Sequence, residues 1–161
     1  MNLEDQFAQL WASMNDYTET EFLRRIEALV SELPADDPIG LFERAASLDS
    51  TGHSDLAVPL YQQALSRGLS GERRRRAVIQ MASSLRNLGR AVDSARLLEE
   101  ERNHTSDHLD DAVNAFLALA LVDLGREREA VSVALKALAR HLPRYNRSLA
   151  NYADLLMSGD S

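Results

Sequence analysis

Apolar residues recur along this chain every three or four positions, which is the spacing of amphipathic helices. No long stretch alternates apolar and polar side chains, and β-branched residues are sparse, so no strand is predicted. Turn signals divide the pattern into about nine helical segments: two before Pro38, six between Pro38 and Pro143, and one over about residues 145–156. The pattern therefore predicts an all-α fold with short turns.

Helix-start signals locate several of these segments. Thr18 and Glu21 have the spacing of a capping box, and Asp37 followed by Pro38 is typical of an N-cap followed by proline at the first helical position. Asp107 is predicted to cap the helix that ends at Gly125.

A repeat is marked by the three glycines Gly52, Gly89 and Gly125, which are 37 and 36 residues apart. The stretch Leu-Arg-Asn-Leu-Gly-Arg at 85–90 is closely matched by Leu-Val-Asp-Leu-Gly-Arg at 121–126. Five residues after each glycine comes a small side chain, which lets two helices cross closely: Ala57, Ser94 and Ala130. Helix–turn–helix units with a period in the thirties indicate a solenoid.

These residues resemble the tetratricopeptide repeat (TPR) family. In that family a large residue, then a Leu and a small residue, then an aromatic line the first helix, a glycine ends it, and a small residue and an aromatic mark the second helix. In the second repeat, the family's places are held by Val78, Met81, Ala82, Leu85, Gly89, Ser94 and Leu98. The chain departs from the pattern at Arg44 and Asn114, which are polar, and at Ala134, which is small. The sequences of residues 33–38 and 48–52 also resemble those of a small, bacterial, stand-alone subgroup of the family.

The resemblance implies an α-α superhelix, a TPR-like solenoid with a concave groove that binds protein or peptide. Three repeats are expected at residues 38–71, 72–106 and 107–143. Acidic helices over residues 1–37 precede them, and a C-terminal capping helix and tail over 144–161 follow, because the last repeat of a solenoid needs a cover.

The groove of such a superhelix is lined by the first helix of each repeat. The candidate groove residues are Phe42, Arg76, Ile79, Ser83, Phe116 and Leu119. Family members that bind a C-terminal carboxylate use Lys, Arg and Asn there, and only Arg76 fits, so a carboxylate clamp is not expected. The apolar residues leave two alternatives: an open peptide groove, or a groove covered by the N-terminal helices or by a dimer mate.

Charge is distributed unevenly within the net −7 of the chain. Residues 1–37 hold nine acids and two arginines, net −7, whereas residues 72–103 hold five acids and eight arginines, net +3. The candidate basic patch is Arg73, Arg74, Arg75, Arg86 and Arg90. It is interpreted either as a solvated face or as a surface for an acidic partner, of which segment 1–37 is the strongest internal candidate. The acidic chain and the lack of interleaved aromatics argue against nucleic acid.

An apolar stripe near the N-terminus contains Phe7, Leu10 and Trp11, the only tryptophan. Core packing is the default interpretation. Self-association through these residues is the alternative, since Trp concentrates at interfaces.

Other chemistry has little support in the sequence. The chain has no cysteine, and no nucleophile–base arrangement, phosphate loop or paired-carboxylate motif stands out. His104 and His108 have zinc-like spacing, but the expected cap at Asp107 leaves His104 in a loop, so neither a metal nor a cofactor is expected. The longest apolar run, at residues 115–122, is too short for a membrane span, and no secretory signal is recognised, so a cytoplasmic location is expected.

The sequence thus predicts a non-catalytic protein-interaction or scaffold module that self-associates, as a homodimer for example. The alternatives are a monomeric receptor for an acidic or amphipathic peptide, and a small ligand-binding sensor or enzyme domain.

Overall fold

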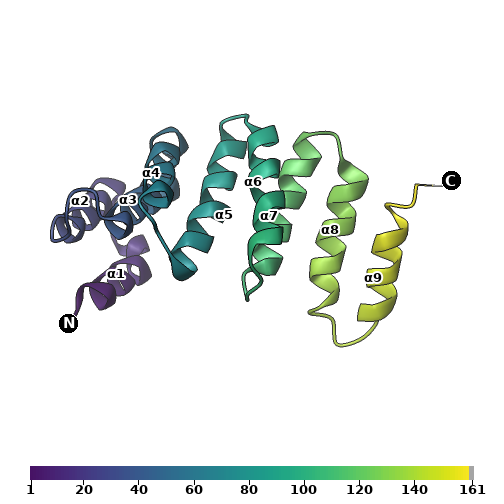
Figure 1. The fold of residues 1–161 in the computed structure, drawn as a ribbon. Coiled ribbons are helices and arrows are strands. Elements are labelled where there is room, and N and C mark those ends of the chain that lie inside the picture. Colours follow the sequence, from purple (N-terminus) through teal and green to yellow (C-terminus); the bar gives the residue numbers. More distant parts are fainter. Residues whose placement is uncertain (160–161) are drawn as a thin grey trace. The chain divides into compact units, whose positions relative to one another are not determined.

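The computed structural model describes residues 1–159 of the chain. Over these residues it contains nine α-helices, one short 3-10 helix and no strand, which confirms the all-α prediction (Figure 1). The chain divides into two compact units, residues 1–84 and the residues from 85 onward, each described here by itself.

The N-terminal unit is built from six elements, the last of which crosses its boundary. They are α1 (Leu3–Ala12), η1 (Met14–Asp16), α2 (Glu19–Val30), α3 (Pro38–Ser50), α4 (Ser54–Ser66) and α5 (Gly71–Asn87). Two predicted helix starts are confirmed. Thr18 and Glu21 form the capping box of α2, and the Asp37 carboxylate accepts hydrogen bonds from the first N–H groups of α3, which begins with Pro38.

The core of the first two helices lies between α1 and α2. Its buried members are Phe7, Leu10, Phe22, Ile26 and Val30. Trp11 is half-buried against this cluster, with its ring edge-on to Phe22 at 5.1 Å between centroids. Phe7 and Leu10 are thus placed as the core-packing interpretation expects, at 2% and 8% exposure.

Close approach of α3 to α2 depends on Gly40. A Cβ at this position would lie 3.0 Å from Cγ1 of Val30, tighter than ordinary contact. Glycine therefore lets the first helix of the first repeat pack directly on the end of α2.

The C-terminal unit contains α6 (Ala91–His104), α7 (Asp110–Asp123), α8 (Glu127–Ala139) and α9 (Asn146–Leu155). These helices pack in chain order, each on the next. The last helix is fixed by a buried hydrogen bond from Ser132 Oγ to the Ala153 carbonyl at 2.7 Å and by an ion pair between Lys136 and Asp154.

The predicted cap at Asp107 is wrong, because α7 begins three residues later at Asp110. The carboxylate of Asp107 instead accepts the N–H of Leu109 at 2.8 Å, and the Asp110 carboxylate accepts the Asp107 N–H at 3.0 Å. These hydrogen bonds stabilise a turn at residues 107–110 in place of a first helical turn. Asp side chains often compete with helix formation in this way, because they can bond to nearby backbone N–H groups.

The repeat glycines end α3, α5 and α7 in the same way. Gly52, Gly89 and Gly125 have φ of 88°, 77° and 71°, a left-handed conformation that favours glycine. The N–H after each glycine donates to the carbonyl five residues earlier, as in His53 to Leu48 at 2.8 Å. This closure caps the helix and reverses the chain, which explains why the glycines mark the repeat.

Candidate protein-interaction surfaces

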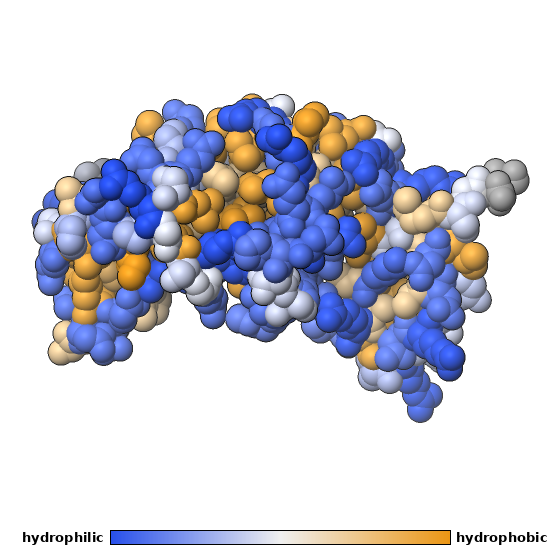
Figure 2. Space-filling model, viewed as in Figure 1, coloured by the Kyte–Doolittle hydropathy of each residue, from blue (hydrophilic) through white to orange (hydrophobic). Residues whose placement is uncertain are grey.

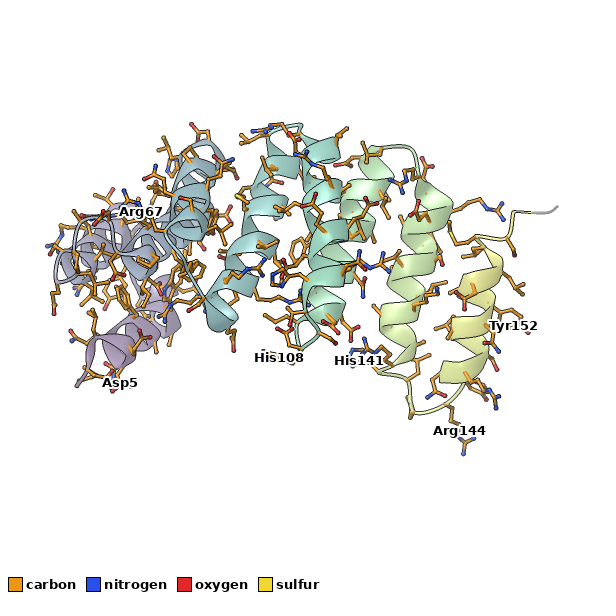
Figure 3. The ribbon with its side chains drawn as sticks, viewed as in Figure 1. Asp5, Arg67, His108, His141, Arg144 and Tyr152 are labelled. Atoms are coloured by element: carbon orange, nitrogen blue, oxygen red, sulfur yellow. The ribbon has the colours of Figure 1, made fainter. Side chains whose placement is uncertain are left out.

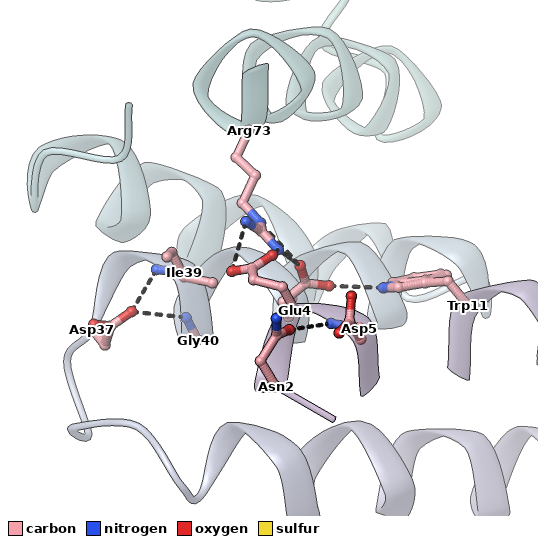
Figure 4. A network of polar contacts seen from close by, with 9 residues as sticks. Asn2, Glu4, Asp5, Trp11, Asp37, Ile39, Gly40 and Arg73 are labelled. Atoms are coloured by element: carbon pink, nitrogen blue, oxygen red, sulfur yellow. Dashed lines mark hydrogen bonds and ion pairs between the residues drawn. The ribbon is translucent and has the colours of Figure 1, made fainter. Parts of the chain in front are cut away.

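A buried carboxylate on α3 is hydrogen-bonded to side chains of two other helices. Glu43 is 3% exposed, and both of its oxygens accept hydrogen bonds from other helices (Figure 4). Trp11 Nε1 on α1 donates to Oε2 at 2.7 Å. On α5, Nε and Nη2 of Arg73 each donate to Oε1 at 3.1 Å. The charge is thus buried together with its counter-charge, the arrangement that burial of a carboxylate requires.

Arg73 is shared between Glu43 and the N-terminal helix. Its Nη1 and Nη2 donate to the two carboxylate oxygens of Glu4, at 3.2 and 2.7 Å (Figure 4). Burial by itself lowers the pKa of Arg73, but the hydrogen bonds and charges of Glu4 and Glu43 outweigh burial and raise the pKa overall. One guanidinium therefore joins α1, α3 and α5 through two carboxylates.

A second polar cluster lies between α3, α4 and α5. The hydroxyl of Tyr61, a fully buried residue, donates to Oε1 of Gln80 at 2.8 Å. Ser84 Oγ donates to Asp49 Oδ1 at 2.6 Å. Burial, together with the charge of Asp49, raises the pKa of the Tyr61 phenol. The phenol therefore stays neutral, and its hydrogen bond links α4 to α5.

The groove candidates of the N-terminal unit are mostly covered. Phe42 is fully buried, and the guanidinium of Arg76 lies 5.3 Å from its ring centroid. Ile79 is 6% exposed, and Arg76 and Ser83 are half-buried. Phe42 also packs against Tyr61 of α4, with 6.2 Å between ring centroids, so these side chains do not form an open apolar groove.

The groove candidates of the C-terminal unit are more open. On α7, Phe116 is half-buried and Leu119 is 45% exposed. Val122, one helical turn further on, is 48% exposed. They share one face of α7 because residues three and four apart are neighbours on a helix.

The solvated-face interpretation of the arginine run is wrong for Arg75, which is 2% exposed. It also fails for Arg73, which binds Glu4 and Glu43, and Arg74 is half-buried. In the C-terminal unit, Arg86 pairs with Asp123 at 2.7 Å and Arg90 with Asp93 at 2.8 Å. Much of the predicted basic patch is therefore neutralised within the chain.

The contact of Glu4 with Arg73 joins segment 1–37 to the arginine run, as one interpretation of the basic patch expected, but the sequence did not single out Glu4. Glu4 lies seven residues before Trp11, so the two share a face of one helix, but this spacing did not indicate Arg73 as a partner. Nothing in the local sequence of Glu43 indicated a buried ion pair.

The last helix carries exposed apolar side chains of its own. Tyr152 and Leu155 on α9 are 67% and 63% exposed, and Figure 3 shows Tyr152 pointing outward. Tyr145, just before α9, is 74% exposed and has φ of 64°, a left-handed backbone that is unusual for tyrosine. Figure 2 shows orange hydrophobic atoms between blue hydrophilic ones on the viewed face.

Comparison with known sequences decides the family. The model of the family described as "Tetratrico peptide repeat" matches residues 38–156. The chain belongs to the tetratricopeptide repeat family. A search of curated proteins found no match to the sequence.

A solved structure called "MamA MSR-1 C2" has a similar fold. It has a TM-score of 0.63 and 15% sequence identity to this chain, over 96% of this chain and 78% of that chain. At this identity the likeness concerns the fold, and it agrees with the predicted TPR-like solenoid.

Two consequences follow from the TPR identity. The matched range extends through α9, so the last helix belongs to the family pattern rather than to an unrelated tail. TPR repeats are, in general terms, protein–protein interaction scaffolds, and the surfaces above are therefore considered as binding surfaces for proteins.

The histidine pair of this TPR protein is split between two elements. His104 is the last residue of α6, and His108 lies in the loop before α7. Among residues 1–159, no group of three or more His, Asp or Glu side chains is arranged to hold a metal ion. Over the same range, no helix is long and apolar enough to cross a membrane.

Proposed function

We propose that this TPR protein is a non-catalytic module that binds a protein or peptide through the inner face of its first helices, and that α7 carries the accessible part of that face. The observation that carries the proposal is the apolar stripe of Phe116, Leu119 and Val122, of which the last two are 45% and 48% exposed. Apolar side chains that share a helical face and remain exposed are typical of an interaction site.

The chemistry of the stripe favours an amphipathic partner over an acidic one. Its side chains offer area to an apolar face, as in the binding of a helix in a groove. The nearby cation Arg86 is already paired with Asp123 in the same unit. A partner segment with apolar residues at helical spacing therefore fits α7 better than a run of acids.

Site-specific photo-crosslinking tests this proposal. A photoreactive phenylalanine analogue placed at Leu119 in the full chain, expressed in its host, should give a discrete crosslinked partner. The matched control is Leu138 on α8, which is 50% exposed but belongs to the second helix of its repeat. Equal crosslinking patterns at both positions, or none at Leu119, would contradict binding through α7.

Self-association is a second candidate, carried by α9. The proposed surface consists of Tyr152 and Leu155 on α9 and of Tyr145 just before it, all of which are exposed. We infer that a homodimer would use this surface, since Phe7 and Leu10 are buried in the core of their own chain. Light scattering should show a dimer for the wild type and a monomer for Leu155→Glu. A strictly monomeric wild type at tens of micromolar would rule it out.

We further propose the division into acidic N-terminal helices over residues 1–37, three repeats over 38–143 and a capping helix over 144–161. It is supported by the helix pairs α3–α4 and α7–α8, each of which falls within one proposed repeat. A sensor or enzyme role has no comparable observation in its favour.

A further inference from the structure

The N-terminal helix α1 is joined by polar contacts to two helices of the repeats. Through two side chains, α1 contacts α3 and α5: Glu4 binds Arg73, and Trp11 binds Glu43. Arg73 and Glu43 also bind each other at 3.1 Å. The four groups form a continuous series of contacts, from Glu4 through Arg73 and Glu43 to Trp11, across three helices (Figure 4).

We propose that the Glu43–Arg73 pair is a binding site for a partner helix that presents a carboxylate and, seven residues later, an indole N–H, and that α1 occupies this site as an intramolecular competitor. The site lies in the N-terminal unit and is separate from the α7 surface. It rests on the proposed function only in that the chain binds proteins.

The charges of the pair define what the ligand must offer. Arg73 has donors left over after it binds Glu43, and in α1 these are taken by the two oxygens of Glu4. A guanidinium matches a carboxylate in this two-point geometry, which a lone ammonium cannot reproduce. The ligand group that contacts Arg73 is therefore a carboxylate.

Glu43 defines the second requirement. Its Oε2 accepts the Trp11 N–H at 2.7 Å while Oε1 is used by Arg73. Because the carboxylate is 3% exposed, an Oε2 without a donor would be costly. An N–H donor on a large apolar ring supplies both the hydrogen bond and the cover, and the indole of tryptophan has both properties.

The spacing of the two ligand groups follows from helix geometry. Glu4 and Trp11 are seven residues apart, about two turns, so both project from one face of α1. The order is also fixed, because the carboxylate comes first and the indole second along the helix. A partner helix with the reverse order would need to run in the opposite direction over α3.

Competition by α1 sets the condition for binding. The helix is held by Phe7 and Leu10 as well as by its polar groups, and it is joined to α2 through residues 13–18, which include η1. A partner in trans must therefore displace a tethered helix, whose effective concentration is high. Weakening the two polar contacts of α1 should open the site to an added helix.

The test uses the full chain and a labelled peptide with the sequence of residues 1–18 as the probe. The double variant Glu4→Gln/Trp11→Phe keeps an aromatic ring beside Phe22 but lacks the carboxylate and the indole N–H. Fluorescence anisotropy should show that the double variant binds the peptide at least about tenfold more tightly than the wild-type chain does. Adding Arg73→Ala to the double variant should abolish this gain.

Two controls separate the outcomes. A peptide that carries the same two substitutions should bind the double variant no better than the natural peptide binds the wild-type chain. If the double variant loses its cooperative thermal unfolding, Glu4→Gln alone, which changes an exposed carboxylate, should still bind the natural peptide several-fold more tightly than the wild type.

The proposal would be overturned if the natural and the doubly substituted peptide bound the double variant equally well. It would also be overturned if the natural peptide still bound tightly after Arg73→Ala was added to the double variant. Either result would leave crosslinking at Leu119 unaffected, because that test concerns another unit. Conversely, loss of crosslinking at Leu119 would contradict the proposed function at α7 without changing the peptide result.

Discussion

Equivalent repeat positions have opposite chemistry in the two units of this protein. Nine residues before its repeat glycine, α3 carries Glu43, whereas α7 carries Phe116. Six residues before the glycine, α3 carries Ala46, which is 3% exposed, and α7 carries Leu119, which is 45% exposed. Charged side chains are usually exposed and apolar ones buried, but here the charged Glu43 is buried and the apolar Leu119 is exposed.

The difference teaches that the repeat sets where a side chain points, while neighbouring elements set which side chain is tolerated there. Glu43 can be buried because Trp11 and Arg73 supply donors from α1 and α5. A buried charge without such partners would be strongly unfavourable. Leu119 needs no polar partner, and its exposed side chain belongs to the surface proposed above for binding.

The largest expected effect concerns the anchoring of α1. Phe7→Ala should lower the free energy of unfolding of the N-terminal unit by about 3–5 kcal/mol, since it leaves a cavity in a packed core. Leu119→Ala on the open surface should cost less than about 1 kcal/mol. Urea denaturation of both variants measures the contrast. Similar small losses for the two would mean that α1 does not cover the N-terminal unit.

The next effect concerns the buried charge. Glu43→Gln should lower the free energy of unfolding by about 1.5–3 kcal/mol, because hydrogen bonds to a charged group are lost in a buried place. Glu27→Gln is the matched control: Glu27 also pairs with an arginine, Arg44, but its side chain is 56% exposed, and the expected loss is below about 1 kcal/mol. Equal losses in denaturation would show that the burial of Glu43 has no energetic consequence.

A smaller effect, of opposite sign, is expected in the C-terminal unit. Tyr145→Gly should raise the free energy of unfolding by about 1 kcal/mol, because glycine adopts the left-handed backbone at φ 64° without strain. Thermal unfolding measures the change, with Tyr152→Gly inside α9 as a control that should be destabilising. A destabilised Tyr145→Gly would mean that the exposed ring contributes to the fold.

The smallest effect is a pH dependence at an exposed pair. The hydrogen bond from Arg44 holds the pKa of Glu27 below its ordinary value of 4.5. A lowered carboxyl pKa stabilises the fold above that ordinary value, and the contribution is lost as the pH falls through the folded pKa. The difference between wild type and Glu27→Gln should therefore shrink between pH 7 and pH 3. A difference independent of pH would show that the pair has no linkage to folding.

The helices could be predicted from the sequence because their signals are local. The capping residues Thr18 and Asp37 and the repeat glycine Gly89 all act on their own turn of backbone. The prediction of an N-cap at Asp107 was wrong because an Asp side chain can bond to the same N–H groups in a short loop as in a cap. The residue type alone does not decide between the two.

The inner surfaces could be predicted only in part. The repeat pattern placed Phe116 and Leu119 on the first helix of the third repeat, but their exposure depends on which elements pack nearby. The contact of Glu4 with Arg73 joins residues far apart in the chain, and no local pattern determines such a pairing. The burial of Arg75 was also missed, because burial depends on the elements that pack against α5 and not on the local sequence.

The central claim is that the predicted groove residues are covered in the N-terminal unit and more exposed in the C-terminal unit. Hydroxyl-radical footprinting of the full chain tests it most directly, because Phe42 and Phe116 are the same residue type and both are predicted groove residues. We predict that Phe116 is oxidised several-fold faster than Phe42, which is fully buried. Equal rates, or faster oxidation of Phe42, would contradict the account.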